Sequence, residues 1–303
     1  MTKKISLFFL LAALYLLPVC AEAQETNGLK LPLIPTELRT PEKRASYLAA
    51  HYWDHFLFRD SLQYLNHPET VEQAVVDFID LFRLVPSSEA ETAITHVMQQ
   101  ASCTRNGLFF FYNTFEKYLY DLASPMRNEA YFIPVLEQMV ASERLSAEDK
   151  IRPEMLLQSV RKNRVSSPAT DFNYTLADGS QQSLYALKAT WTLLLFFDPD
   201  CDECHQAIQE IQQNQFFQEL IQQKELTLLA VYPGDNLKHW KLMQPNLPAE
   251  WLVAYDKEQS IYTNELYDIL GFPSLYLLDR QKIVRLKDTA PAQVEAYLKS
   301  ANL

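Results

Sequence analysis

The sequence predicts two domains of different class, an all-helical domain followed by an α/β domain with a central sheet. At 303 residues the chain is long enough for two ordinary domains. Apolar residues recur at helical spacing in the first half, whereas a continuous apolar run, Trp191 to Phe197, indicates a buried strand in the second half. The helical pattern ends near Ser166-Ser167-Pro168. We therefore place the boundary between residues 165 and 166.

Residues 1–23 have the organisation of a secretory signal peptide. Two lysines precede an apolar run from Ile5 to Leu17, and Ala21-Glu22-Ala23 offers small residues for cleavage. The run is shorter than the roughly 20 residues of a membrane-spanning helix, and a buried helix is the alternative. Cys20 resembles the cysteine of a lipoprotein site, although Val19 is bulkier than the residue usual there. The sequence predicts an exported protein that is either soluble or tethered to a membrane through a lipid anchor on Cys20.

Composition and charge argue against several classes of protein. Hydrophobic residues make up 48% of the chain and charged residues 21%, which is typical of a globular protein and not of a disordered one. The count of 5 glycines argues against glycine-rich phosphate loops. A net charge of −11 disfavours nucleic acid as a partner. After cleavage Cys103, Cys201 and Cys204 would remain, which cannot form a closed disulfide framework.

The first domain is expected to be helical from residue 46 to residue 165, after a polar, proline-containing lead-in over 24–45. Apolar residues between 71 and 85 fall on one helix face. The segments Thr70–Gln73 and Ser88–Glu91 fit the capping box, in which a hydroxyl and a Glu or Gln side chain bind free backbone amides. Further helices are expected over 107–122, 128–142 and 147–161.

The second domain is expected to alternate strands and helices. Residues 172–176 alternate in polarity, and Asp178-Gly179 predicts a hairpin turn after them. The run from Trp191 to Phe197 has no polar face, as expected of a strand covered on both sides. An amphipathic helix follows, with Ala207, Ile208 and Ile211 inward. Further strands are expected over 226–232, 251–255, 274–278 and 283–286, and a last helix over 291–300.

A Cys-x-x-Cys motif, Cys201 to Cys204, lies between the buried strand and that helix. The positive end of the helix dipole favours the thiolate of Cys201, and Cys204 one turn away is placed to resolve a mixed disulfide. Structural zinc is an alternative, but only His205 is near as a further ligand. Covalent attachment of haem is a second alternative, since Cys201 to His205 fits the pattern C-x-x-C-H. We predict no metal and no cofactor other than a redox-active Cys201–Cys204 disulfide.

Two segments resemble the thioredoxin fold of the TlpA/ResA-like cell-envelope group, over roughly residues 167–303. They are FFDPDCDEC, residues 196–204, and GFPSLYLLD, residues 271–279. The resemblance implies an α/β thioredoxin-like domain in which Pro273 is cis and lies against the cysteines. It also implies that the backbone of Phe272 positions an extended substrate strand. The resulting expectation is an exported thiol–disulfide oxidoreductase.

The helical half also resembles known proteins. Ser124–Glu129, together with Phe197–Cys201, is similar to envelope proteins of Gram-negative bacteria in which a helical domain of unknown function precedes a thioredoxin-like domain. This resemblance implies a location in the periplasm or cell envelope. The expected partners are protein thiols and disulfides of the envelope and an unidentified electron donor.

Three positions depart from the thioredoxin pattern. Asp200 stands where thioredoxins usually carry Trp, and Leu195 replaces the buried acid six residues before the first cysteine. Ala207 occupies the position where some related proteins place an acid after the second cysteine. The proton acceptor for Cys204 is therefore open between four acids: Asp198, Asp200, Glu203 and Glu210.

Four acids, Asp198, Asp200, Asp202 and Glu203, crowd the motif. At ~7 Å and an effective dielectric of about 40, each disfavours a thiolate by roughly 1 kcal/mol, and together they could cancel the effect of the helix dipole. Destabilising the thiolate makes the couple more reducing. We expect a reductase or isomerase, with His205, Asp200 and Glu203 as modulating residues. The alternative is that the acids are solvated loop charges.

For three other groups of residues, a role in core packing is an alternative to a role in binding or redox chemistry. His51 and His55 have the spacing of a metal pair, but the aromatic residues around them favour a packing face. Phe109–Phe111 could line a ligand groove or belong to a core, and Cys103 could be a third redox group or a buried thiol. A second class of function also stays open, in which the thioredoxin fold is a scaffold and the helical domain captures an envelope partner.

Overall fold

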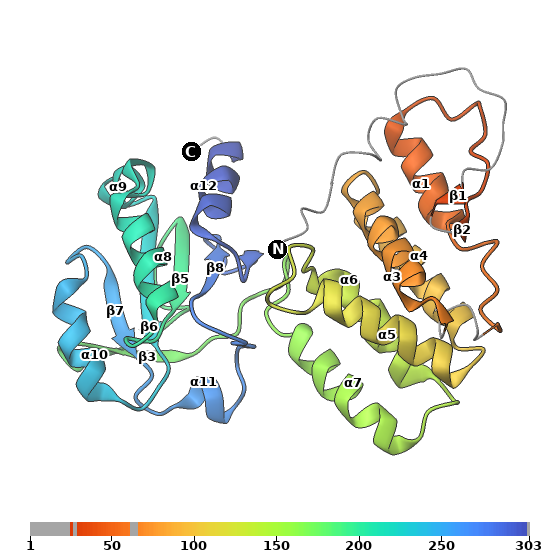
Figure 1. The fold of residues 1–303 in the computed structure, drawn as a ribbon. Coiled ribbons are helices and arrows are strands. Elements are labelled where there is room, and N and C mark those ends of the chain that lie inside the picture. Colours follow the sequence, from red (N-terminus) through yellow and green to blue (C-terminus); the bar gives the residue numbers. More distant parts are fainter. Residues whose placement is uncertain (1–24, 27–28, 61–65, 302–303) are drawn as a thin grey trace, which may run out of the picture. The chain divides into compact units, whose positions relative to one another are not determined.

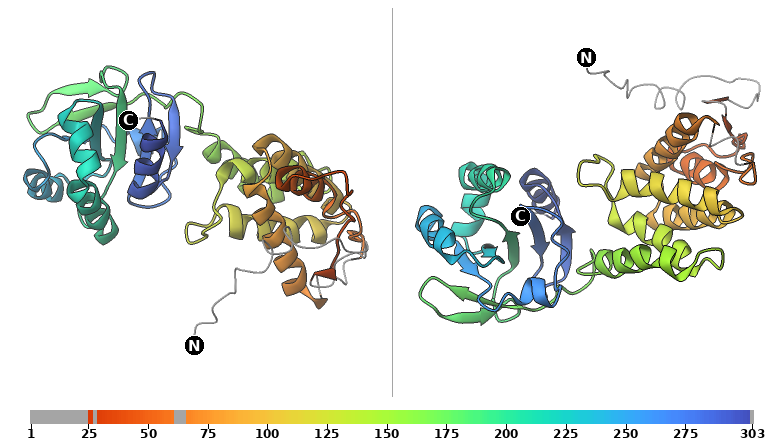
Figure 2. Two further views of the ribbon diagram at one scale, coloured as in Figure 1. Left: turned by 90° about the horizontal axis from the view of Figure 1, so that it is seen from above. Right: turned by 60° about the horizontal axis from the view of Figure 1, so that its bottom comes forward.

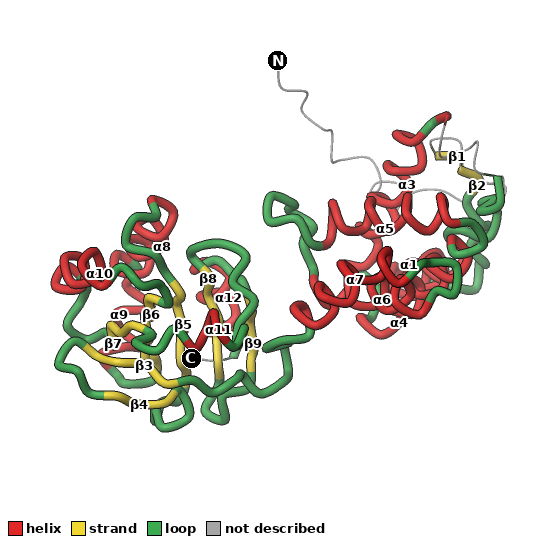
Figure 3. Tube along the Cα trace, turned by 90° about the horizontal axis from the view of Figure 1, so that it is seen from below, coloured by secondary structure: helices red, strands yellow, loops and turns green. Residues whose placement is uncertain are grey.

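The computed structural model describes residues 25–26, 29–60 and 66–301 (Figure 1). The predicted signal peptide and Cys20 lie outside these residues. The chain divides into two compact units, Met1–Leu157 and Gln158–Leu303. Apart from the two-residue strands β1 (Glu25–Thr26) and β2 (Leu29–Lys30), the strands in Figure 3 belong to the second unit. An all-helical region followed by an α/β sheet domain is therefore confirmed.

Helices form the first unit. They are α1 (Pro41–His51), α3 (Pro68–Asp80), the short 3₁₀ helix η2 (Leu81–Arg83), α4 (Ser87–Ala101), α5 (Arg105–Leu119), α6 (Glu129–Ala141) and α7 (Ala147–Val160). Among them, α4, α5 and α6 pack against one another. No helix of the described residues is both long and apolar enough to cross a membrane.

Four helices begin earlier than predicted, among them α5, which was expected from residue 107 and begins at Arg105. The segment expected to be extended up to residue 45 already enters α1 at Pro41. The capping boxes at Thr70 and Ser88 are wrong, because α3 begins at Pro68 and α4 at Ser87, and neither has a side-chain cap. Proline suits the first turn of a helix, where its missing N–H would have had no partner. At α1 and α3, prolines therefore mark a helix start.

The core of the helical unit is largely aromatic. The ring of Trp53 lies 5.2 Å from that of Phe111 and 5.9 Å from that of Phe78, measured between centroids. Phe56 and Phe58 contact the same cluster, with centroids 5.9 and 5.4 Å from Phe111. Such tilted and edge-to-face pairs stabilise a core beyond the area they bury. The aromatic residues near His51 and the side chain of Phe111 therefore serve packing.

The second unit contains a seven-stranded sheet in the order β4-β3-β7-β6-β5-β8-β9. The strands are β3 (Asn173–Leu176), β4 (Gln181–Ser183), β5 (Trp191–Phe196), β6 (Leu226–Tyr232), β7 (Leu252–Tyr255), β8 (Ser274–Leu278) and β9 (Val284–Lys287). The helices are α8 (Asp202–Gln213), α9 (Gln215–Gln222), α10 (Leu237–Met243), η3 (Gln244–Asn246), α11 (Ser260–Thr263) and α12 (Pro291–Ser300). Strands β5, β6 and β7 are parallel, and β8 is antiparallel to β5. The predicted strands and the hairpin at Asp178-Gly179 are confirmed.

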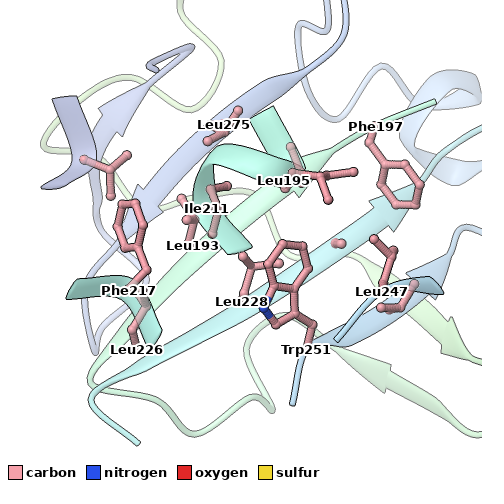
Figure 4. Close-up of a cluster of buried hydrophobic side chains, with 14 of the residues drawn as sticks. Leu193, Leu195, Phe197, Ile211, Phe217, Leu226, Leu228, Leu247, Trp251 and Leu275 are labelled. Atoms are coloured by element: carbon pink, nitrogen blue, oxygen red, sulfur yellow. The ribbon is translucent and has the colours of Figure 1, made fainter. Parts of the chain in front are cut away.

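The central strand β5 is buried on both faces of the sheet. Leu193 and Leu195 join one apolar cluster with side chains of α8, α9 and α12, part of which Figure 4 shows. Leu194 and Phe196 point to the opposite face, into a cluster that includes Ile261 of α11. The views of Figure 2 show α8 and α12 beside the sheet. Because both faces of β5 are covered, its sequence is continuously apolar. The packing also holds in place the end of β5, which leads through a short turn to the cysteines.

Candidate active site

The strand β5 and the helix α8 place the Cys-x-x-Cys motif. β5 ends at Phe196, and after a short turn Cys201 occupies the N-cap of α8 with an extended backbone. The Cys201 Sγ accepts a hydrogen bond from the backbone N–H of Cys204 at 3.1 Å. This N–H is one of the amides that a helix start leaves without an internal partner. The Cys201 sulfur therefore lies at the positive end of α8, where a thiolate is stabilised.

The two cysteines of the motif differ in burial. Cys201 is half-buried, whereas Cys204 is 0% exposed and belongs to the apolar cluster that contains Leu195. Burial raises the pKa of the Cys204 thiol well above its ordinary value, and the hydrogen bond with Cys201 adds to the effect. Both cysteines are free thiols. The arrangement is an accessible thiol with a protonated thiol held one helical turn below it.

The loop before β8 closes the other side of the motif. Ser274 of β8 pairs with Phe196 of β5, so the end of the loop lies beside the cysteines. The Cys201 thiol faces the carbonyl oxygen of Phe272, with 3.6 Å between sulfur and oxygen. The Phe272–Pro273 peptide bond is cis, as the resemblance implied. The structure therefore brings Phe272 and Pro273 to the cysteines, while their role in positioning a substrate stays a prediction.

The carboxylates at the motif occupy two environments. Asp198 is half-buried, its Oδ1 accepts the N–H of Asp200 at 2.8 Å, and its carbonyl accepts the N–H of Cys201 at 3.2 Å. The others, Asp200, Asp202 and Glu203, are exposed. Glu203 comes closest to the nucleophile, with its Oε2 3.9 Å from the Cys201 Sγ.

Asp198 is the carboxylate that acts on the resolving thiol. Asp198 has two opposite effects on this thiol: the hydrogen bond with its backbone lowers the pKa of Cys204, and its negative charge raises that pKa. Leu195 and Ala207, where related proteins carry an acid, are both buried apolar residues here. Of the four acids that the sequence left open, Asp198 therefore has the best position for a proton acceptor.

Sequence reasoning missed His239, a residue of α10. Its Nδ1 lies 2.6 Å from the Oδ2 of Asp200, although the two residues are 39 positions apart. No motif links them, because the contact depends on how the loop after β6 folds back. His205, which the sequence predicts to be a modulating residue, is exposed on α8, and its ring makes no hydrogen bond within the described residues.

The remaining candidate residues do not assemble into a second reactive site. α1 ends at His51, whose ring binds Asp54 at 2.8 Å, and His55 is exposed beyond the helix end, so the expected helical spacing is lost. Among the described residues, no three His, Cys, Asp or Glu side chains are grouped as metal ligands. Cys103 follows α4 in the first unit and is half-buried, outside the elements that build the motif.

Selective alkylation should follow from the unequal burial of the two cysteines. At pH 7.5 we expect iodoacetamide to modify Cys201 at least about a hundredfold faster than Cys204, since a raised thiol pKa leaves little thiolate. The raised pKa of Cys204 also affects stability. In the unfolded chain this thiol loses its proton at a lower pH than in the folded protein, so the free energy of unfolding falls as the pH rises above the ordinary thiol pKa. A Cys103→Ser background restricts the readout by mass spectrometry to the motif. Equal rates for Cys201 and Cys204 would contradict this description of the site.

Comparison with known families and structures follows the division into two units. Residues 18–163 match a domain of unknown function, DUF5106, and residues 165–287 match the AhpC/TSA family. The chain is similar to a thioredoxin-like protein from Bacteroides caccae ATCC 43185, with 40% identity and a TM-score of 0.87. That match covers 90% of this chain and 98% of the other.

Two further structures match less than half of this chain. One is the C-terminal domain of an uncharacterized protein from Bacteroides fragilis NCTC 9343, with 37% identity and a TM-score of 0.45. The other is the thioredoxin domain of a thiol-disulfide oxidoreductase from Bacteroides vulgatus, with 18% identity and a TM-score of 0.41. Each covers 45% of this chain, and 98% and 96% of its own length. Among curated proteins, none matches.

Proposed function

This chain belongs to the thioredoxin-like proteins, with a DUF5106 domain ahead of an AhpC/TSA domain, and on that premise we propose that it is an exported thiol–disulfide oxidoreductase. The observation that carries the proposal is the pair of thiols at the start of α8. Cys201 is accessible and caps the helix, and Cys204 is buried behind it with its backbone N–H 3.1 Å from the Cys201 sulfur. Two-step disulfide exchange requires an accessible thiol that attacks the substrate and a second, buried thiol that reacts only with the mixed disulfide.

The reaction begins with the thiolate of Cys201. It attacks one sulfur of a substrate disulfide, forms a mixed disulfide and releases the other substrate sulfur as a thiolate. Cys204 then loses its proton and attacks the Cys201 sulfur, which breaks the mixed disulfide and releases the second substrate thiolate. Two electrons have passed to the substrate, and Cys201 and Cys204 are joined by a disulfide. A dithiol donor must reduce this disulfide before the next cycle.

Asp198 serves as the proton acceptor for Cys204 in this scheme. It is half-buried, its charge acts on the resolving thiol, and its Oδ1 is fixed by the N–H of Asp200. Phe272 and Pro273 hold the substrate backbone beside the Cys201 sulfur, which supports the role that the resemblance implied for them. Asp200, Glu203 and His205 modulate the thiols through their charge.

An Asp198→Asn variant should slow the second step more than the first. The asparagine side chain still accepts the N–H of Asp200 but cannot act as a base. We therefore expect the rate of the second step to fall at least about tenfold. Reaction with an aromatic disulfide such as DTNB releases one coloured thiolate when Cys201 attacks and a second when Cys204 resolves. In an Asp202→Asn control, which removes an exposed charge of α8, the second step should keep its rate. Equal slowing of both steps by Asp198→Asn would remove Asp198 from this role.

The surplus of acids supports a reducing couple. Asp198, Asp200, Asp202 and Glu203 all lie on the turn before α8 or in its first turn, so they oppose the stabilisation that the helix gives a thiolate. Destabilising the thiolate favours donation of electrons. We therefore propose a reductase or isomerase, not a strong oxidant.

The proposed location is the periplasm or cell envelope of a Gram-negative bacterium: the signal-peptide pattern in residues 1–23 supports export, and the resemblance to envelope proteins supports the compartment. The proposed partners are envelope proteins with thiols or disulfides and a dithiol electron donor. We propose no nucleic acid partner, no metal and no cofactor other than the Cys201–Cys204 disulfide. A membrane link would require lipidation of Cys20. Haem attachment fits the spacing less well than thiol chemistry does, because the Cys204 side chain is enclosed in the core.

A second candidate function is capture of an envelope partner with the thioredoxin fold as a scaffold, for which an open pocket in the helical unit offers a place. The pocket has a volume of about 290 Å³, and it is lined by Ile79, Phe82, Arg83, Pro125, Met126, Arg127, Asn128 and Tyr131. Turnover separates the two functions. An oxidoreductase should catalyse reduction of insulin disulfides by dithiothreitol, and a Cys201→Ser/Cys204→Ser variant should not. A wild-type protein without turnover would favour capture.

A further inference from the structure

His239 is held firmly enough to act on the turn that precedes Cys201. The next residue on α10, Trp240, is buried, and its indole N–H donates to the Ala254 carbonyl at 3.1 Å. The side chain of Asn236 caps α10 by accepting the N–H of His239 at 3.4 Å. From this position the His239 Nδ1 reaches the Asp200 Oδ2 at 2.6 Å. A packed helix therefore brings an imidazole to the residue adjoining the nucleophile.

The surroundings of this imidazole are mostly acidic. The acids Asp198, Asp200 and Asp235 act electrostatically on Tyr232, at the end of the strand that precedes α10, and the Tyr232 hydroxyl accepts the N–H of Asn236 at 3.1 Å. The helix α10 itself carries Lys238 and Lys241. The two lysines are exposed and belong to the same short helix. The His239 imidazole is in direct contact with Asp200, and the contact is an ion pair when the imidazole is protonated.

We propose that His239 is a positioning residue whose protonation neutralises Asp200 and thereby adds to the pH dependence that any dithiol pair has, by changing the stability of the Cys201 thiolate. The inference rests on the proposed function. Imidazole changes its charge between about pH 5 and 8. Below that range the Asp200–His239 pair is neutral, and the Cys201 thiolate faces one negative charge fewer. Above it Asp200 is uncompensated and the pair becomes more reducing.

The contact contributes little to stability. The side chains of His239 and Asp200 are 43% and 65% exposed, and exposed ion pairs stabilise folds only weakly. Its effect on the neighbouring thiol is larger, because a unit charge at about 7 Å in an effective dielectric of about 40 changes a thiolate equilibrium about fivefold. We therefore expect a functional effect without a marked loss of fold.

The test compares alkylation of Cys201 in the full mature chain at pH 6 and pH 8.5, in a Cys103→Ser background. His239→Asn keeps a donor near the position of Nδ1 but carries no charge. We expect it to slow alkylation at pH 6 about fivefold and to match the wild type at pH 8.5. His239→Lys keeps a positive charge at both pH values and should keep the fast rate at both. His96→Asn, on an exposed face of α4, is the matched control and should change neither rate.

An Asp200→Asn background decides whether the effect passes through Asp200. There, His239→Asn should slow alkylation at pH 6 clearly less than it does in the wild-type background, because the carboxylate that holds the protonated imidazole beside the motif is gone. If His239→Asn slows alkylation equally at both pH values, or slows it equally in the Asp200→Asn background, the proposal is wrong and His239 is only structural. Failure of the proposed function is distinguishable: the motif would then not cycle in glutathione buffers, whatever the alkylation rates.

Discussion

A Cys204→Ser variant is expected to accumulate covalent complexes with substrate proteins. Cys201 can still attack a disulfide, but the thiol that releases the substrate is missing. The resolving step is intramolecular, and groups fixed in this way react as if present at effective concentrations of about 10⁵ M or more. We therefore expect the mixed disulfide to live at least about a thousandfold longer than in the wild type. Non-reducing electrophoresis of envelope extracts, followed by mass spectrometry, measures the accumulation.

Two controls make the trapping experiment decisive. Cys201→Ser and the double serine variant should trap nothing, since Cys204 is enclosed in the apolar cluster and cannot meet a substrate. All trapped bands should disappear when dithiothreitol is added. Partners that are recovered equally with all three variants, and without a covalent bond, would support the capture function in place of an oxidoreductase.

A Phe111→Ala substitution should strongly destabilise the helical unit while leaving the thiol chemistry in place. Phe111 is 0% exposed, and its ring contacts those of Trp53, Phe56 and Phe58. Removing a fully buried phenylalanine costs about 3–5 kcal/mol of stability, because it loses apolar contacts and leaves a cavity. Urea denaturation followed by far-ultraviolet circular dichroism measures the loss. The site residues all come from the second unit, so the potential of the cysteine pair should not move.

Phe109→Ala is the matched control for this prediction. Phe109 lies two positions earlier on the same helix, is only half-buried, and stacks on the Arg105 guanidinium at 4.7 Å. Its removal should cost less than about 1.5 kcal/mol. If both variants lose the same stability, the aromatic cluster is not the core. If Phe111→Ala also shifts the potential of the motif, the two units are coupled in function.

The sheet could be predicted well because burial on both faces leaves a clear pattern. The runs at 226–232 and 274–278 match β6 and β8 residue for residue, and the run beginning at Trp191 contains β5. These strands have no solvent face, so almost every residue is apolar and their limits are sharp. The fold class followed from this pattern, together with the motif at the end of β5.

Helix starts were less predictable, because side-chain caps and proline compete for the same positions. The hydroxyl of Thr70 fits a capping box by sequence, but Pro68 already has the fixed backbone angle of a first helical turn. At α1 the two act together: the Thr40 side chain caps the helix by accepting the N–H of Lys43, and Pro41 occupies its first turn, within a segment expected to be extended. The spacing of apolar residues and the capping residues therefore predict a helix in each region, whereas the proline in the first turn marks the residue at which it begins.

The parts of the site that lie far apart in the sequence were only partly predictable. Phe272 and Pro273 were found because a known family carries the same motif. His239 has no such motif, and its contact with Asp200 arises only when α10 packs through Trp240 onto β7. Asp198 could be named as one of four acids, but choosing it needed the burial of its surroundings.

The central claim is that Cys201 and Cys204 form a redox couple of the reducing type. A titration in glutathione or dithiothreitol buffers, with the two thiols followed by alkylation and mass spectrometry, measures it directly. We predict a reversible two-electron transition at about −230 mV or below, on the side of thioredoxin, which lies near −270 mV. A potential near −120 mV, that of a strong oxidant, would contradict the reducing assignment. A pair that never cycles would contradict the claim itself.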